Sequence, residues 1–119
     1  MIKLPKFTTQ SMYDSETDFN LQMDRERLSK FLIHYEVFKN IKNVNGSIVE
    51  CGIFKGTSFI RLAMFRELFK KKSKLVGFDI FGDIYPDTVF KNEKKHRLHW
   101  VKSAGHSSIS KKQLQSIFK

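Results

Sequence analysis

Two short apolar runs with one amphipathic stretch between them constrain the fold of this 119-residue chain more than any other feature. The first run, residues 47–51, is rich in β-branched side chains and ends at Gly52, as a buried strand does. The second run, residues 75–80, has a similar character, and the stretch between them follows Gly56 with helical spacing. Strand, helix and strand within roughly 33 residues predict a βαβ unit with parallel strands and a right-handed crossover.

The helix of this unit is expected to begin at Thr57 or Ser58, either of which can act as an N-cap. It ends in a lysine-rich stretch, residues 70–74, whose positive charge suits the negative end of the helix dipole. The apolar face predicted for this helix consists of Ile60, Leu62, Ala63, Phe65, Leu68 and Phe69.

A second amphipathic helix is predicted upstream, over residues 20–41. Its apolar side chains recur at steps of three and four and are Leu28, Phe31, Leu32, Tyr35 and Phe38. The chain before it shows no sustained period, so we predict an irregular or lid-like arm at residues 1–23 and one domain portion at residues 24–119.

The C-terminal third is predicted to contain less regular structure. Residues 89–101 indicate a loop plus a short helix, whereas Ser110 and Gln113 have the spacing of a capping box. The apolar stripe behind this cap is Leu114, Ile117 and Phe118, and the chain stops inside that helix. Because an α/β layer needs several strands and only two are convincing, we expect the N-terminal part of an incomplete α/β fold.

A candidate ligand site lies where the first strand passes into the helix. Gly52 and Gly56 allow a sharp turn and the close approach of a ligand, and the helix N-terminus presents free N–H groups. Asp79 closes the second strand, where an acid can accept hydrogen bonds from both hydroxyls of a ribose. Phe54 stands where the dinucleotide-binding motif has its middle glycine, which disfavours pyrophosphate. An adenosine ligand with an amino-acid end fits this pattern best.

Residues 48–58 and residues 77–82, together with Pro86, resemble the macrocin O-methyltransferase (TylF/MycF-type) family of class I S-adenosylmethionine-dependent methyltransferases. The resemblance covers about residues 24–118, and its most specific part is Glu-Cys-Gly, a hydrophobic residue, an aromatic residue, a basic residue and Gly, followed by Ser. The aromatic residue of that motif is Phe54. The resemblance implies the N-terminal part of a Rossmann-like fold.

The same resemblance implies how S-adenosylmethionine is bound. Gly52 and Gly56 would line its methionine end beside Phe54, with Glu50 reaching the ammonium group and Ser58 helping to hold the carboxylate.

Two further residues would contact the adenosine: Asp79 would bind the ribose hydroxyls and Phe81 would pack near the adenine. Simpler interpretations stay open, namely that Glu50 pairs with a nearby lysine, that Asp79 forms a turn and that Phe81 packs in the core.

The reaction implied is O-methylation of a hydroxyl on a sugar or a sugar-decorated metabolite. In this family the Mg²⁺-binding acids and the catalytic base come from the second half of the domain, and no position here matches them. Catalytic residues therefore stay unknown, and we expect binding of S-adenosylmethionine rather than independent turnover, because methyl transfer needs the hydroxyl proton removed. A neighbouring chain of a homo-oligomer or a longer natural product could supply the missing half and close the fold; the alternative is a truncated chain that is inactive alone.

Charge leaves two other classes of function open. The formal charge of +10 can attract nucleic acid, anionic lipid or a phosphorylated small molecule. The alternatives are a non-catalytic nucleotide or nucleotide-sugar binding module and a basic nucleic-acid-binding protein that stacks bases on Trp100, Phe90 and Tyr85. The excess lysines gather in clusters typical of helix ends and solvated faces, so nucleic acid is disfavoured.

Cys51 is the only cysteine, so no intrachain disulfide can form, and we expect its thiol to be buried at the strand end. No secretory signal or membrane-spanning pattern is present, which predicts a cytoplasmic protein without a membrane partner. His96 and His99 have the spacing of two metal ligands on a helix, with His106 elsewhere, but no third ligand has a diagnostic spacing. We therefore assign no metal ligand.

Overall fold

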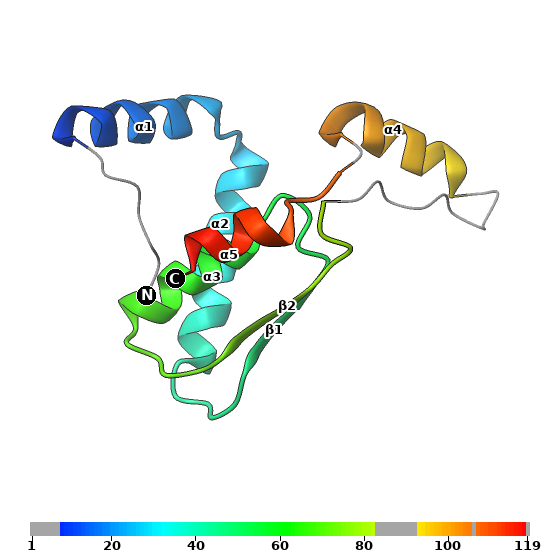
Figure 1. Cartoon of the computed structure of the whole chain (residues 1–119). Coiled ribbons are helices and arrows are strands. Elements are labelled where there is room, and N and C mark those ends of the chain that lie inside the picture. Colours follow the sequence, from blue (N-terminus) through cyan, green and yellow to red (C-terminus); the bar gives the residue numbers. More distant parts are fainter. Residues whose placement is uncertain (1–7, 83–92, 106, 119) are drawn as a thin grey trace.

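The protein has a mixed α/β fold of five helices and one two-stranded parallel sheet in the described part of the chain. The structure is a computed structural model that describes residues 8–82, 93–105 and 107–118. Its elements in chain order (Figure 1) are α1 (Thr9–Gln22), α2 (Arg25–Ile41), β1 (Ile48–Cys51), α3 (Thr57–Leu68), β2 (Leu75–Phe78), α4 (Lys94–Ala104) and α5 (Lys111–Ile117).

The predicted strand–helix–strand unit is confirmed. β1 and β2 pair in parallel, with Ile48 opposite Leu75 and Cys51 opposite Phe78. The pairing continues one step past the strands, because the Gly52 N–H donates to the Phe78 carbonyl over 2.8 Å. Both strands are four residues long, so each is shorter than the sequence run that predicted it.

α3 packs against this sheet through Gly77 of β2. A Cβ atom at Gly77 would lie 2.3 Å from Ile53 Cδ1 and 2.8 Å from Phe59 Cε2, so only a glycine lets these side chains approach the strand. The buried residues of α3 are Phe59, Ala63 and Phe65. Leu68, which we expected on the packed face, is exposed, whereas Phe65 and Phe69 beside it pack in the core.

The expected side-chain cap of α3 is wrong. The N-cap residue is Gly56 in the left-handed conformation (φ 83°), and no side chain caps the helix. Ser58 instead donates its hydroxyl to a carboxylate of β1. A glycine suits this position because the left-handed region carries a penalty for residues with a Cβ.

α2 lies against α3 through an aromatic cluster. Phe38 is fully buried and, with Ile48 and Phe65, forms the first core cluster, against which Phe31 and Tyr35 pack. The Phe38 ring stacks on Phe69 and tilts against Phe65, with ring centroids 5.6 and 5.7 Å apart.

Two members of the predicted stripe of α2 are wrong, since Leu28 and Leu32 are exposed. The helix covers α3 with the narrower face that carries Phe31, Tyr35 and Phe38. It also begins at Arg25 rather than near residue 20, because Asp24 accepts a hydrogen bond from the Arg27 N–H and caps it.

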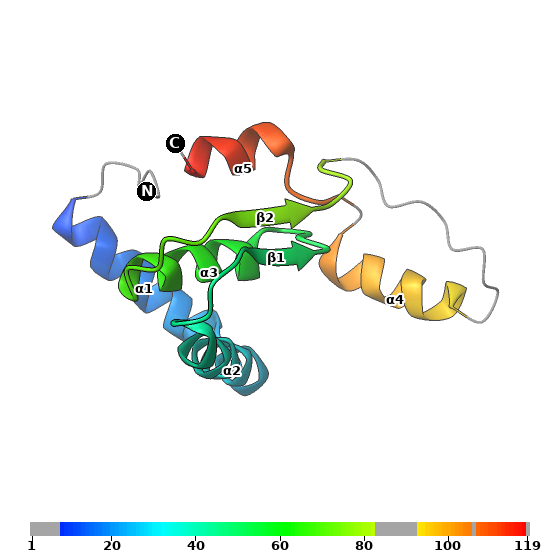
Figure 2. The ribbon, with the colours of Figure 1, turned by 90° about the horizontal axis from the view of Figure 1, so that it is seen from below.

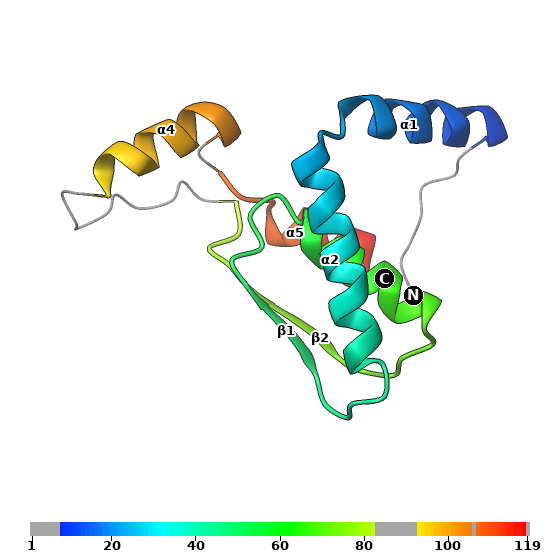
Figure 3. The ribbon, with the colours of Figure 1, turned by 180° about the vertical axis from the view of Figure 1, so that it is seen from behind.

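We expected an irregular or lid-like arm before α2; the irregular alternative is wrong for Thr9–Gln22, which form α1, and the lid-like one stays a prediction. Thr8 caps this helix by accepting a hydrogen bond from the Ser11 N–H. α1 has no buried residue, and Figures 1 and 3 show it projecting away from the strands. Its sequence lacked an apolar period because the helix packs no face against the core.

α5 lies beside β2, on the side away from α2 (Figure 2). The capping box of Ser110 and Gln113 is confirmed, with both reciprocal hydrogen bonds present. Leu114 is buried and joins Ile53 and Phe59 in the second core cluster. The short helix expected within residues 89–101 is present as α4, which extends to Ala104 and lies to one side of the sheet in Figure 1. Its Val101 is buried.

One face of the sheet is open. Val49 and Phe78 are more than half exposed, and Cys51 is exposed rather than buried, so that expectation is wrong. The alternation of a strand places Ile48 toward the core and Val49 and Cys51 on the opposite face. Among the described helices, none has the length and apolar character that crossing a bilayer requires.

Candidate functional site

A loop with left-handed residues, residues 52–56, connects β1 to α3 and is called the glycine loop below. Gly52 and Gly56 both have φ 83°, and Phe54 adopts φ 52° although it is not a glycine. A large side chain in this region costs about 1–3 kcal/mol, so the surrounding structure must hold it there.

Asp79 provides that hold. Its Oδ2 accepts a hydrogen bond from the Phe54 N–H over 2.7 Å, and its Oδ1 accepts one from the Phe81 N–H over 3.3 Å. Both bonds are partly buried and charge-assisted, which makes them stronger than neutral ones. The structure thus brings Asp79 and the glycine loop together at the carboxyl ends of the two strands, as the sequence predicted for this pair.

Glu50 of β1 lies beside the start of α3, and its Oε1 atom accepts a hydrogen bond from the Ser58 hydroxyl. Its other oxygen, Oε2, is buried and has no hydrogen-bond partner among the described residues. Burying a carboxylate oxygen without a donor costs free energy, so such atoms commonly mark sites that take a ligand or an ion. No lysine ion pair involves Glu50 in the described structure, so the simpler interpretation of this residue is not observed.

The remaining predicted residues lie in different surroundings. Gly52 is exposed, and a Cβ built on it would point into open space. Gly56 is buried, and its Cβ position lies 3.6 Å from Ile109 and Leu114 side chains, so it supports the loop from beneath. Phe81 packs against the second core cluster, in agreement with the core alternative.

The segment before α5 also holds the glycine loop, and sequence reasoning missed it. The Ile109 N–H donates to the Phe54 carbonyl, and Ser108 Oγ accepts from the Gly82 N–H over 2.8 Å. Lys55 Nζ donates to the Ser107 carbonyl over 2.6 Å. The contacting residues are 26 (Gly82 and Ser108) to 55 (Phe54 and Ile109) positions apart in the sequence, so no local sequence pattern predicts these contacts.

A second feature that sequence reasoning missed is a basic cavity of about 160 Å³ between α2 and the first turn of α3. We call it the basic cavity; its lining residues are Arg27, Lys30, His34, Thr57, Ser58 and Arg61. The first three follow one another on α2 at steps of three and four, a signal present in the sequence. The sequence predicted the helix that carries Arg61, but it did not show that this helix packs with Arg61 opposite α2.

Charges in the basic cavity act on one another. Burial lowers the pKa of Arg61, and the neighbouring Arg27 lowers it further. The pKa of His34 is lowered, first by burial and then by the positive charges of Arg61 and Lys30. The negative charge of Glu50 opposes this by raising the pKa. Arg61 Nη1 lies 3.3 Å from His34 Nδ1, and its guanidinium lies 4.7 Å from the centre of the Phe31 ring.

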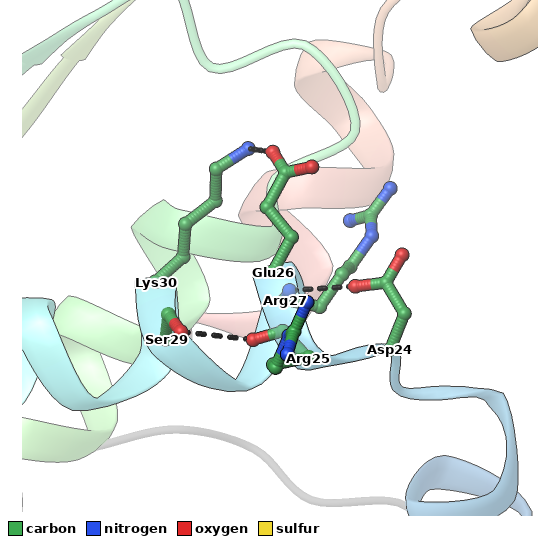
Figure 4. A network of polar contacts seen from close by, with 6 residues as sticks. All are labelled: Asp24, Arg25, Glu26, Arg27, Ser29 and Lys30. Carbon is green, nitrogen blue, oxygen red and sulfur yellow. Dashed lines mark hydrogen bonds and ion pairs between the residues drawn. The ribbon is translucent and has the colours of Figure 1, made fainter.

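The start of α2 is fixed by a short polar network, drawn in Figure 4. Besides the Asp24 cap, the Ser29 hydroxyl donates to the Arg25 carbonyl over 2.9 Å, and Lys30 pairs with Glu26 over 2.8 Å. Because both Lys30 and Glu26 are largely exposed, that ion pair contributes little stability. These bonds are local to the first turns of α2, the part of the helix that carries Arg27 and Lys30.

Other candidate residues do not form a site in the described part of the chain. No group of three His, Cys, Asp or Glu side chains gathers there as metal ligands would, and His96 and His99 lie exposed on α4. His106, Tyr85, Pro86 and Phe90, and the side chain of Trp100, lie outside the described residues.

Comparison with known proteins returned no match: no family model fits the chain, and no curated protein and no solved structure is detectably similar to it. The resemblance of residues 48–58 and 77–82 to macrocin O-methyltransferases therefore stays a prediction.

Proposed function

We propose that this chain binds S-adenosylmethionine at the glycine loop, as the N-terminal part of a Rossmann-like O-methyltransferase whose acceptor is a hydroxyl on a sugar or a sugar-decorated metabolite. The observation that carries this proposal is the buried Glu50 Oε2 atom, which lacks a donor in the described structure. An ammonium group, such as that of the methionine end of the cofactor, would satisfy it.

The surroundings of Glu50 fit the other parts of this cofactor. Gly52 faces open space at the strand end, where a ligand can approach the backbone. Asp79 lies across the glycine loop at the end of β2, the position at which an acid binds ribose hydroxyls in nucleotide-binding α/β proteins. Ser58 sits in the first turn of α3, where free N–H groups favour a carboxylate.

When bound, S-adenosylmethionine supplies an activated methyl group. The residues named here bind and orient it, and none of them is assigned as the base that deprotonates an acceptor hydroxyl. The proposal for this chain is therefore a cofactor-binding function within a methyltransferase.

Calorimetric titration with S-adenosylmethionine tests the proposal, run on the unaltered chain and on Glu50→Gln. The substitution keeps the size of the side chain and removes its charge, so we expect affinity to fall about tenfold or more, since a charged hydrogen bond contributes about 1.5–3 kcal/mol. Glu36→Gln is the matched control, because Glu36 is exposed on α2 and pairs with Lys39 of the same helix.

Two results would contradict the proposal: no binding by the folded chain, or equal affinity in Glu50→Gln. A parallel titration with ATP separates the cofactor from a nucleotide, the alternative ligand of the same loop. Tighter binding of ATP than of S-adenosylmethionine would favour a nucleotide-binding module instead.

A further inference from the structure

The basic cavity holds more positive charge than the described chain neutralises. Arg27 and Arg61 form no ion pair with a carboxylate in the described structure, and the only ion pair of Lys30 is the exposed one with Glu26. The Glu50 carboxylate acts on His34, where it opposes the lowering of the pKa by the cations. Arg27 and Arg61 therefore face each other without a carboxylate partner in the described structure, with Lys30 beside them.

Placing the positive charges of Arg27 and Arg61 close together costs free energy unless an anion binds between them. Arg61 is half-buried, which removes part of the water that would screen it from Arg27. Its guanidinium is also held in place, by Phe31 on one side and His34 on another. A guanidinium held in this way is preorganised for a ligand, because little further side-chain conformational entropy is lost when the ligand binds.

The first turn of α3 adds backbone N–H donors to the lining of the basic cavity. Thr57 and Ser58 line the basic cavity, and no side chain caps the helix. The N–H groups of a first turn have no partner within the helix and favour anions. Guanidinium groups and helix N–H donors together form a binding site for a tetrahedral oxyanion.

An adjoining cavity of about 260 Å³ shares Arg27, Thr57 and Arg61 with the basic cavity. Its other walls are Phe19, Gln22 and Met23, from the end of α1 and the turn that follows. A ligand that placed its anionic group between the arginines would have room for an organic part against Phe19 and Met23. The second cavity makes a small organic ligand a better fit than a free inorganic ion.

We propose that the basic cavity binds the phosphate group of a phosphorylated small molecule, whose organic part lies against Phe19 and Met23. A phosphate carries more negative charge than a carboxylate and accepts paired hydrogen bonds from two guanidinium groups, which matches Arg27 and Arg61. This site adjoins the proposed cofactor site, because Ser58 and the first turn of α3 are assigned to both. Its test uses a phosphate ligand and does not depend on S-adenosylmethionine.

Titration of the full chain with phenyl phosphate, beside benzoate, tests this proposal by calorimetry. We expect saturable binding of phenyl phosphate, weaker binding of benzoate, and about a tenfold or greater loss of phenyl phosphate affinity in Arg27→Gln. Arg27 forms no side-chain bond in the described structure, so this variant keeps the fold. Arg25→Gln is the control, since it removes the same charge from the same helix outside both cavities.

Glu50→Gln distinguishes this site from the cofactor site. Removing the Glu50 charge should strengthen phenyl phosphate binding, whereas it should weaken binding of S-adenosylmethionine. Three results would overturn the phosphate site: no binding of phenyl phosphate, equal losses in Arg27→Gln and Arg25→Gln, or benzoate binding as tightly as phenyl phosphate, which would indicate a carboxylate site.

Discussion

The glycine loop and the basic cavity meet at the first turn of α3, but their charged groups are held in different ways. In the loop, the Asp79 carboxylate accepts hydrogen bonds from the Phe54 and Phe81 N–H groups, so the chain itself satisfies the charge. In the basic cavity, Arg27 and Arg61 face each other without an acid of the described chain between them. One charged group thus organises the fold, whereas the two arginines have no counter-charge from the described chain.

The two regions also depend on different parts of the core. The first core cluster packs α2 against α3, the two helices that line the basic cavity. The second core cluster places Ile53 of the glycine loop between Gly77 and α5. Perturbing one cluster should therefore affect one region more than the other.

The largest effect is expected for Phe38→Ala, which removes the fully buried ring between α2 and α3. Such truncations cost about 3–5 kcal/mol, a large fraction of the 5–15 kcal/mol by which domains are typically stable. Urea unfolding followed by circular dichroism measures the loss. Leu32→Ala on the same helix is the control and should cost less than about 1 kcal/mol, because Leu32 is exposed. Equal losses would refute the assigned packing face of α2.

Gly77→Ala should act on the other region, at a cost of about 1–3 kcal/mol, because the new methyl group overlaps Ile53 and Phe59. The same unfolding experiment applies. Adding Ile53→Val removes the Cδ1 atom that lies 2.3 Å from the new Cβ, so the double variant should regain part of the loss. A double variant no more stable than the sum of the two single losses would argue against this contact.

Asp79→Ala should cost about 1 kcal/mol, near the low end for an unsatisfied donor, since the Phe54 N–H is only partly buried. Amide hydrogen exchange should show faster exchange at Phe54 and little change in α2. Asp79→Asn keeps an oxygen acceptor and should protect Phe54 better than alanine does. Unchanged Phe54 exchange in Asp79→Ala would remove the structural role assigned to this carboxylate.

The smallest effect concerns pH and the basic cavity. The native pKa of His34 lies below its ordinary value of about 6.5, mainly through burial and the charges of Arg61 and Lys30, with Glu50 opposing. Between the two values the unfolded chain binds the extra proton, so stability falls as the pH falls below about 6.5. Thermal unfolding between pH 8 and pH 5.5 should show His34→Gln losing less stability than the unaltered chain. Parallel curves would mean that His34 does not contribute.

Sequence reasoning predicted the elements whose signals are local. The βαβ unit followed from two apolar runs and a helical period, and the α5 cap from Ser110 and Gln113. It failed for α1, because a helix without a buried face has no apolar period to detect. It also failed for Leu28, Leu32 and Cys51, because burial depends on which neighbours cover a face.

The candidate site divides in the same way. The closeness of Asp79 to the glycine loop could be predicted, because the carboxyl ends of neighbouring parallel strands meet at one edge. The Ile109 and Ser108 contacts could not, since they join segments far apart in the chain. The burial of Gly56 beneath Ile109 and Leu114 depends on the same contacts.

The order of elements around the glycine loop follows from the sequence alone, because strand and helix periods and turn residues act over a few neighbouring positions. Only the tertiary structure decided that Arg61 of α3 faces Arg27 and Lys30 of α2 across a cavity, and that Glu50 keeps one oxygen without a donor in the described structure. The physical reason is that charge pairing and burial depend on distances between elements, which the packing of aromatic side chains such as Phe38 and Phe65 sets.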